Sequence, residues 1–169
     1  MTTAADLIDH HDIRQLVYRY CRAIDRRQFD VVRTCYHPDA TDDHGVYSGG
    51  LDGFMDMIQA DLPRYERTMH FVGNLFIELE GDKAWSEAYT IAYHRLAPYR
   101  DKPRRDYVVG FRYVDRLERR DEWRIAARKC LFEWSRLDPV PKGGEFGPDF
   151  LLGVPGSDDP MLLWKQATT

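Results

Sequence analysis

Several features that would define the class of this chain at once are missing from it. No apolar run approaches the roughly 20 residues that a membrane-spanning helix needs, and residues 1–12 have neither the basic region nor the apolar core of a secretory signal. The three cysteines, Cys21, Cys35 and Cys130, are odd in number and widely spaced, which favours buried thiols over a disulfide framework. We therefore expect a cytoplasmic protein that makes no membrane contact.

An excess of positive charge is also absent. The formal net charge is −4 and the sequence pI is about 5.8, so neither nucleic acid nor an acidic membrane surface is an expected partner. The densest basic stretch, residues 100–105, is interrupted by Asp101 and Pro103. That stretch is typical of a solvated loop.

Signature motifs of metal, phosphate and nucleophile chemistry are missing as well. The sequence has no HxH or HExxH spacing, no glycine-rich phosphate loop and no GxSxG motif. The run Asp42-Asp43-His44 contains metal-ligating residue types without a metal-binding spacing. We expect no metal and no other cofactor.

What remains is a globular chain of 169 residues, 43% hydrophobic and 13% aromatic, which suits one domain with a substantial core. Apolar residues recur at helical spacing from Ile13 to Ile24. A short second helix is predicted over residues 29–36, followed by a short strand near residues 40–47. Asp52 is the predicted N-cap of a third helix.

From residue 69 the hydrophobic period changes to two, which indicates strands. Four strands of an antiparallel meander are predicted near residues 69–79, 84–96, 107–117 and 123–134. In the first of them, alternation places Phe71 with Leu75, Ile77 and Leu79 on one face and His70 on the other. Helices followed by such a meander predict an α+β fold. The domain is expected to cover residues 1–137, and the proline- and glycine-rich residues 138–169 are expected to form an extended tail.

Asp25 and His70 are the most informative candidate site residues. Asp25 falls in the same i+4 column as Val17 and Cys21, beside the apolar stripe and near the helix C-terminus, where the helix dipole disfavours a carboxylate. A partner should compensate that cost, and either His70 or an arginine could do so. If Asp25 and His70 meet at one pocket, the aspartate can orient the imidazole and the imidazole can accept a proton.

The strand near residues 84–96 separates large side chains from small ones. Small residues next to Thr90 and His94 either leave room for a ligand or accept close helix packing, and the sequence does not decide between these. Arg128 shares a face with apolar neighbours on the last strand. Its predicted counter-charge is Asp25, Asp42 or a substrate group.

Three segments together resemble the SnoaL-like branch of the nuclear-transport-factor-two-like superfamily, which includes dehydratases and a dehydrochlorinase. They are YRYCRAID with the following RRQFD, then RTMHFVGNLFIEL, and finally VDRLERRDEWRIAARK. The resemblance covers about residues 10–135. It implies a cone-shaped α+β barrel of the cystatin-like type, in which N-terminal helices pack in a curved, mostly antiparallel sheet around a deep pocket.

The resemblance also implies roles for individual residues. Asp25 and His70 match the catalytic dyad of the branch, and Arg128 matches an arginine that helps a leaving group to depart. The positions expected to contact substrate are Tyr20, Asp42, Thr90, Ala92, His94, Val109 and Tyr113. Asp42 stands where the dehydrochlorinase has a pocket tryptophan, so an oxygenated substrate is expected. The branch also implies a homo-oligomer, with a trimer favoured over a dimer.

These observations predict a cofactor-independent lyase or isomerase that acts on a small, largely apolar cyclic compound by a dehydratase-like elimination. Two other classes stay open. One is a small-molecule-binding module without turnover, and the other is an accessory protein like the β subunit of a ring-hydroxylating dioxygenase. Loss of turnover in Asp25→Asn and His70→Ala would distinguish the enzyme from both.

Overall fold

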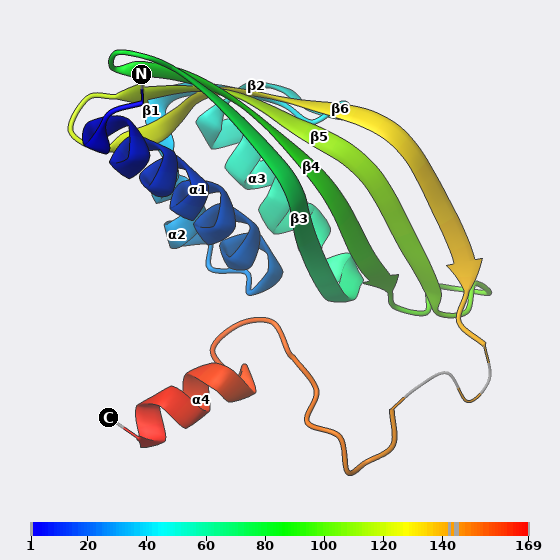
Figure 1. The fold of residues 1–169 in the computed structure, drawn as a ribbon. Coiled ribbons are helices and arrows are strands. Elements are labelled where there is room, and N and C mark those ends of the chain that lie inside the picture. Colours follow the sequence, from blue (N-terminus) through cyan, green and yellow to red (C-terminus); the bar gives the residue numbers. More distant parts are fainter. Residues whose placement is uncertain (1, 142, 144–145, 169) are drawn as a thin grey trace.

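The computed structural model describes residues 2–141, 143 and 146–168. Three helices lie on the concave side of a curved, open six-stranded sheet whose strand order is β2-β1-β6-β5-β4-β3 (Figure 1). The elements in chain order are α1 (Ala4–Asp25), α2 (Phe29–Thr34), β1 (Tyr36–Asp43), β2 (Ser48–Gly50), α3 (Leu51–Asp61), the 3₁₀ turn η1 (Leu62–Arg64), β3 (Tyr65–Glu80), β4 (Lys83–Leu96), β5 (Arg105–Arg119), β6 (Trp123–Pro139) and α4 (Pro160–Ala167). The α+β class and the meander of β3 to β6 are confirmed.

Helix α1 begins earlier than its apolar pattern because its N-terminus is capped. The Thr3 hydroxyl accepts from the Asp6 amide at 3.1 Å, and the Asp6 carboxylate accepts from the Thr3 amide at 2.7 Å, which is a capping box. One stripe of the helix, including Ile13, Val17 and Ile24, is buried in the core. Asp25 is the last residue of α1 and therefore lies where the sheet meets the helix C-terminus.

Two predictions of element boundaries are wrong. The second helix ends at Thr34, and the strand expected near residues 40–47 is β1, which runs from Tyr36 to Asp43. Pro38 fits in this strand because β1 pairs with β6 irregularly between Tyr36 and Thr41, where a missing ladder hydrogen bond costs little.

The predicted N-cap of the third helix is also wrong. Gly50 occupies the N-cap position of α3, and Asp52 lies in the first turn. There the Asp52 carboxylate forms an exposed ion pair with Arg33 at 2.7 Å. A carboxylate in the first turn is favoured by the helix dipole, so the position suits Asp52 without a capping bond.

Strand β3 contains a bulge that changes which side chains face the core. Its pairing with β4 shifts register between Val72 and Leu75, which adds one residue to β3. Val72 and Leu75 therefore both pack against the core, whereas Phe71 is 64% exposed. The predicted grouping of Phe71 with Leu75 is wrong for this reason, and His70 lies on the inner face instead.

Strand β4 behaves as its sequence predicts. Ala88 and Ala92 are fully buried, and Tyr89 and Ile91 on the other face are about half exposed. These small side chains belong to the hydrophobic core, together with the buried residues of α1.

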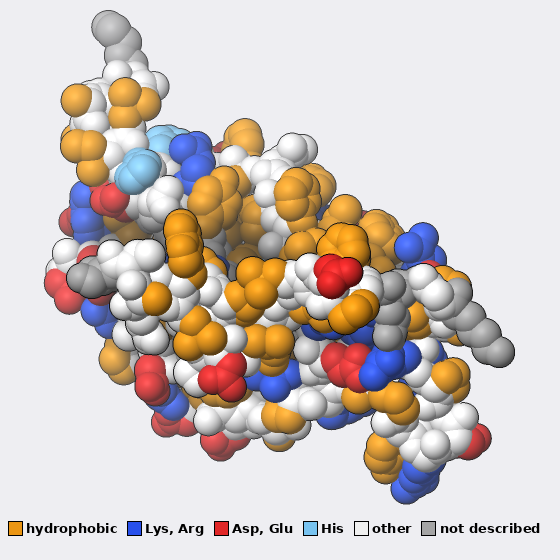
Figure 2. Space-filling view, turned by 90° about the horizontal axis from the view of Figure 1, so that it is seen from below, with side chains coloured by type: hydrophobic (Ala, Val, Ile, Leu, Met, Phe, Trp, Pro, Cys, Tyr) orange, Lys and Arg blue, Asp and Glu red, His pale blue; other side chains and the backbone are white. Residues whose placement is uncertain are grey.

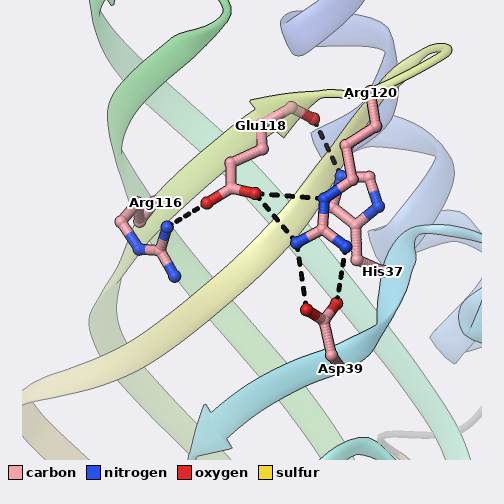
Figure 3. A network of polar contacts seen from close by, with 5 residues as sticks. All are labelled: His37, Asp39, Arg116, Glu118 and Arg120. Atoms are coloured by element: carbon pink, nitrogen blue, oxygen red, sulfur yellow. Dashed lines mark hydrogen bonds and ion pairs between the residues drawn. The ribbon is translucent and has the colours of Figure 1, made fainter.

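An ionic network joins the ends of β1 and β5 (Figure 3). Arg120 donates to both carboxylate oxygens of Asp39, at 2.9 and 3.1 Å, and to Glu118 at 2.9 Å. Glu118 also accepts from Arg116, and its backbone carbonyl contacts His37 Nε2 at 2.9 Å. The network holds β1 against a strand that it does not pair with, at the end of the sheet away from the tail.

The C-terminal segment is not wholly extended, contrary to the prediction. After β6 it passes beneath the helices and forms α4 (Figure 1). The buried Asp159 carboxylate forms an ion pair with Arg26 at 2.9 Å, and the Gly156 amide donates to the Arg26 carbonyl at 2.9 Å. These contacts anchor the segment to the end of α1. Among the described parts of the chain, no helix has the length and apolar character needed to cross a bilayer.

Candidate functional site

A cavity of about 480 Å³ lies between the helices and the concave face of the sheet, a volume suited to a small organic ligand. Its walls come from α1, α3, η1, β3, β4, β5, β6 and the β1–β2 loop. The lining residues are Tyr20, Ile24, His44, Val46, Met57, Ile58, Asp61, Leu62, Arg64, Tyr65, His70, His94, Tyr107, Val109, Phe111, Tyr113, Cys130 and Phe132. Seen from below, hydrophobic side chains gather around the middle of this face of the molecule (Figure 2).

Asp25 and His70 are in direct contact at the wall of this cavity. The Asp25 carboxylate approaches His70 Nδ1 at 2.8 Å with one oxygen and accepts from the His70 backbone amide at 2.8 Å with the other. Their side chains are 11% and 6% exposed. The two contacts satisfy the carboxylate that the C-terminus of α1 would otherwise disfavour, and they fix the position of the ring.

This geometry determines which ring nitrogen is free. Burial raises the pKa of Asp25, but the hydrogen bonds from the His70 ring and amide outweigh it, so the pKa lies below its usual value. An ionised Asp25 can only accept a hydrogen bond, which assigns the proton to His70 Nδ1. In the neutral form of the ring, Nε2 then holds the lone pair, and His70 borders the cavity while Asp25 does not.

His94 is the second histidine beside this pair. Its ring meets the His70 ring edge-on, with centroids 5.6 Å apart. Burial, and to a smaller extent the neighbouring His70, lower the pKa of His94 to about 4. His94 is therefore neutral at pH 7 and lines the cavity as an uncharged group.

The counter-charge of Arg128 was predicted incorrectly. Its guanidinium donates to both carboxylate oxygens of Asp115, each at 2.7 Å, and both side chains are fully buried. The cation also lies 4.0 Å from the ring centroids of Tyr20 and Tyr113. The partner is thus Asp115 rather than Asp25, Asp42 or a substrate group, because the adjacent strand β5 places Asp115 directly opposite Arg128.

The other predicted contact residues divide into two groups. Tyr20, Val109 and Tyr113 line the cavity, as His94 does. Thr90 and Ala92 do not line it: the Thr90 hydroxyl bonds the Ala88 carbonyl, and Ala92 is packed opposite His70 on the neighbouring strand.

Asp42 is close to the cavity without lining it. Its carboxylate accepts from the Tyr36 hydroxyl at 2.7 Å and bonds Nδ1 of His44, and it is 1% exposed. His44 does line the cavity, and the sequence analysis missed it. The strand predicted near residues 40–47 would have placed His44 on the same face as Asp42, two residues away, although β1 ends at Asp43 in the structure. Among the described residues, no group of three or more His, Cys, Asp or Glu side chains could hold a metal.

Helices packed inside a curved open sheet, with a cavity between them, define the nuclear-transport-factor-two-like architecture. The chain belongs to the SnoaL-like domain family, whose model matches residues 5–129. The family predicted from the sequence is therefore confirmed.

Among proteins with which the chain can be aligned, an uncharacterized protein of Mycobacterium tuberculosis H37Rv is 30% identical over 142 residues, covering 78% of this chain and 92% of that protein. Solved structures also share the fold. A putative scytalone dehydratase from Novosphingobium aromaticivorans is 16% identical with a TM-score of 0.72, over 86% of this chain and all of that one (100%). The type 3 hexachlorocyclohexane dehydrochlorinase from Novosphingobium barchaimii is 20% identical with a TM-score of 0.70, over 84% and 96% of the two chains.

Proposed function

We propose that this protein is a cofactor-independent lyase in which His70, oriented by Asp25, removes a proton from a carbon of a small cyclic substrate. The observation that carries the proposal is the contact of 2.8 Å between Asp25 and His70 Nδ1 at the wall of the cavity. The scytalone dehydratase and dehydrochlorinase names of two proteins with this fold agree with such an elimination.

The proposed step uses the Nε2 lone pair of His70. When Nε2 takes the proton, the ring becomes an imidazolium, and the adjacent Asp25 carboxylate stabilises that charge. The electron pair left on carbon forms a double bond as a leaving group departs. General base catalysis of this kind contributes about 10²–10⁴-fold, and the fixed dipoles of the cavity must supply the remainder.

The chemistry restricts the substrate class. Imidazole is a weak base, so the carbon that it deprotonates needs an acidifying neighbour, such as a carbonyl group. The cavity wall is mostly aromatic and aliphatic, which suits an apolar ring. We therefore propose a small cyclic ketone, or a related carbon acid, with a leaving group on the neighbouring carbon.

Arg128 is proposed to act through its neighbours rather than on the leaving group. The guanidinium is fully buried between Tyr20 and Tyr113 and is paired with Asp115. The Tyr20 and Tyr113 side chains border the cavity, so Arg128 holds that part of the wall in place. Burial raises the pKa of Tyr20, which keeps its hydroxyl protonated and able to donate a hydrogen bond.

Cyclic β-substituted ketones test the proposal. The wild-type protein should convert one or more of them to the unsaturated ketone, detected by absorbance and NMR. We expect Asp25→Asn and His70→Gln each to slow turnover by about 10²–10⁴-fold while ligand affinity, measured by NMR titration, changes little. Asp12→Asn and His11→Gln, at exposed positions on α1, are the matched controls.

Two outcomes would favour the other classes. Tight binding of the same ketones without any turnover would support a binding module. Neither binding nor turnover, together with stable association with a dioxygenase α subunit, would support an accessory protein.

The outer face of the sheet supports a proposal about assembly. Phe71, Trp85, Tyr89 and Ile91 are each between 46% and 64% exposed on adjoining strands. Apolar patches of this kind are uncommon on monomers and typical of subunit contacts. We propose that this face joins copies of the chain into a homo-oligomer, with a trimer favoured over a dimer.

A further inference from the structure

A second aspartate–histidine pair lies beside the cavity. Asp42 Oδ1 bonds Nδ1 of His44, and the other oxygen of Asp42 accepts from the Tyr36 hydroxyl at 2.7 Å. The Asp42 side chain is completely buried, and that of His44 is 20% exposed and borders the cavity. This arrangement repeats the one at Asp25 and His70: a buried carboxylate holds one ring nitrogen, and the other nitrogen is left for a ligand.

The two pairs approach the cavity from different sides. Asp42 is in β1 and His44 follows it, whereas His70 is in β3. In the sheet order, β6, β5 and β4 lie between these two strands. The curvature of the sheet brings both ends around the same cavity, so one bound molecule can meet a histidine at each of two separate atoms.

The His44 ring is held by more than its aspartate. It stacks on Phe54 with ring centroids 5.0 Å apart and an interplanar angle of 29°. The backbone around it forms a tight turn, in which the His44 amide donates to the Tyr47 carbonyl at 2.8 Å and Gly45 adopts a φ of +77°. A positive φ is readily available to glycine. A ring fixed by a carboxylate, an aromatic neighbour and a tight turn has the preorganisation that proton transfer requires.

On this basis, and resting on the proposed function above, we propose that His44 with Asp42 is the general acid of the reaction and that the leaving group is an oxygen atom. A halide leaves as an anion and needs no proton, whereas hydroxide or alkoxide is a poor leaving group unless it is protonated. The buried carboxylate of Asp42 would stabilise a proton carried on the His44 ring, and the free ring nitrogen borders the cavity from the side opposite His70.

The step balances as follows. The substrate C–H bond breaks and its proton moves to Nε2 of His70, while the electron pair forms the C=C bond. The C–O bond breaks, and the oxygen takes the proton from Nε2 of the His44 imidazolium. The products are an unsaturated ketone and water or an alcohol. His70 is then charged and His44 neutral. His70 releases one proton to solvent and His44 takes one from solvent, which restores both residues.

Binding of substituted phenols of graded acidity tests the acid without requiring turnover. The phenolate stands in for the departing oxygen, and its absorbance reports its ionisation. We expect the wild type to bind acidic phenols as phenolates, and His44→Gln to weaken that binding by about 10- to 100-fold, the value of one hydrogen bond to a charged group. Asp42→Asn should weaken it in the same direction, and His11→Gln, at an exposed position on α1, should not. Equal phenolate affinity in His44→Gln and wild type overturns the proposal.

Cyclic β-aryloxy ketones test the same residue during turnover. Across a series of aryl groups, we expect His44→Gln to slow the least acidic leaving groups by about 10²–10⁴-fold and to leave a nitrophenolate leaving group nearly unaffected. His44→Phe, which keeps the stacking on Phe54, should behave like His44→Gln if folding is intact. An equal effect on every leaving group contradicts a general acid.

The two series separate the two proposals. Phenolate binding that depends on His44, without elimination of any ketone, supports His44 as a donor to an oxygen anion but rejects the proposed lyase and, with it, the role of general acid. Elimination that depends on His70 but shows no altered leaving-group dependence in His44→Gln supports the lyase and rejects the acid.

Discussion

The buried His94 should make the free energy of unfolding depend on pH. Burial, with His70 nearby, lowers the pKa of His94 from the ordinary value of 6.5 to about 4. Between these two pH values the unfolded chain binds a proton at this position and the folded chain does not. The free energy of unfolding therefore falls as the pH drops through this window, and the loss is complete near pH 4.

The size of the effect follows from the shift. Each pKa unit is worth about 1.4 kcal/mol, so the wild type should lose about 3 kcal/mol from this residue alone between pH 7 and pH 4. His94→Gln removes the titrating group and keeps a polar side chain. Urea unfolding at a series of pH values measures the free energy of unfolding of each protein. Between pH 7 and pH 4 the wild type should lose about 3 kcal/mol more than His94→Gln, because all other titrating groups contribute equally to both.

His11 supplies the control, since it is an exposed histidine on α1. His11→Gln should follow the wild-type curve throughout. If His94→Gln also follows the wild-type curve, the fold does not hold His94 neutral, and the cavity wall is not uncharged at His94.

Three further results are expected. Arg128→Met should cost about 3–5 kcal/mol of unfolding free energy, because it leaves Asp115 buried without a counter-charge. Chemical denaturation should show that the double variant Arg128→Met/Asp115→Leu recovers most of the loss, and an additive loss would contradict the pairing. Trp85→Glu, on the exposed apolar face, should lower the mass measured by light scattering from that of an oligomer to that of a monomer, and a monomeric wild type would refute the assembly. Asp159→Asn, which breaks the ion pair with Arg26, should speed proteolysis within the C-terminal segment several-fold, and an unchanged cleavage rate would show that the pair does not anchor it.

Much of the fold follows from local pattern. Apolar spacing located α1, and the large and small faces of β4 are those that its alternation predicts. The inward direction of His70 could not be obtained in this way. A strand with strict alternation places His70 on the face opposite Leu75, and only the bulge between Val72 and Leu75 brings them to the same side. A bulge is set by pairing with a neighbouring strand and leaves little trace in the period of its own strand.

Some residues of the candidate site could likewise be predicted from the sequence and others could not. Asp25 and His70 could be chosen from sequence because a carboxylate at the end of an apolar helix requires compensation. The partner of Arg128 could not be chosen from sequence, because only the register of β5 and β6 places Asp115 opposite Arg128. His44 was passed over as one member of an acidic run. Its importance depends on sheet curvature, which brings β1 and β3 around one cavity although three strands separate them.

The most direct measurement is deuterium exchange into a cyclic ketone in heavy water, followed by NMR, because it observes proton removal from carbon without requiring any leaving group. We expect the wild type to accelerate exchange at the carbon beside the carbonyl, and His70→Gln and Asp25→Asn to lose about 10²–10⁴-fold of that acceleration. Equal exchange rates in the wild type and His70→Gln would contradict the assignment of His70 as the base.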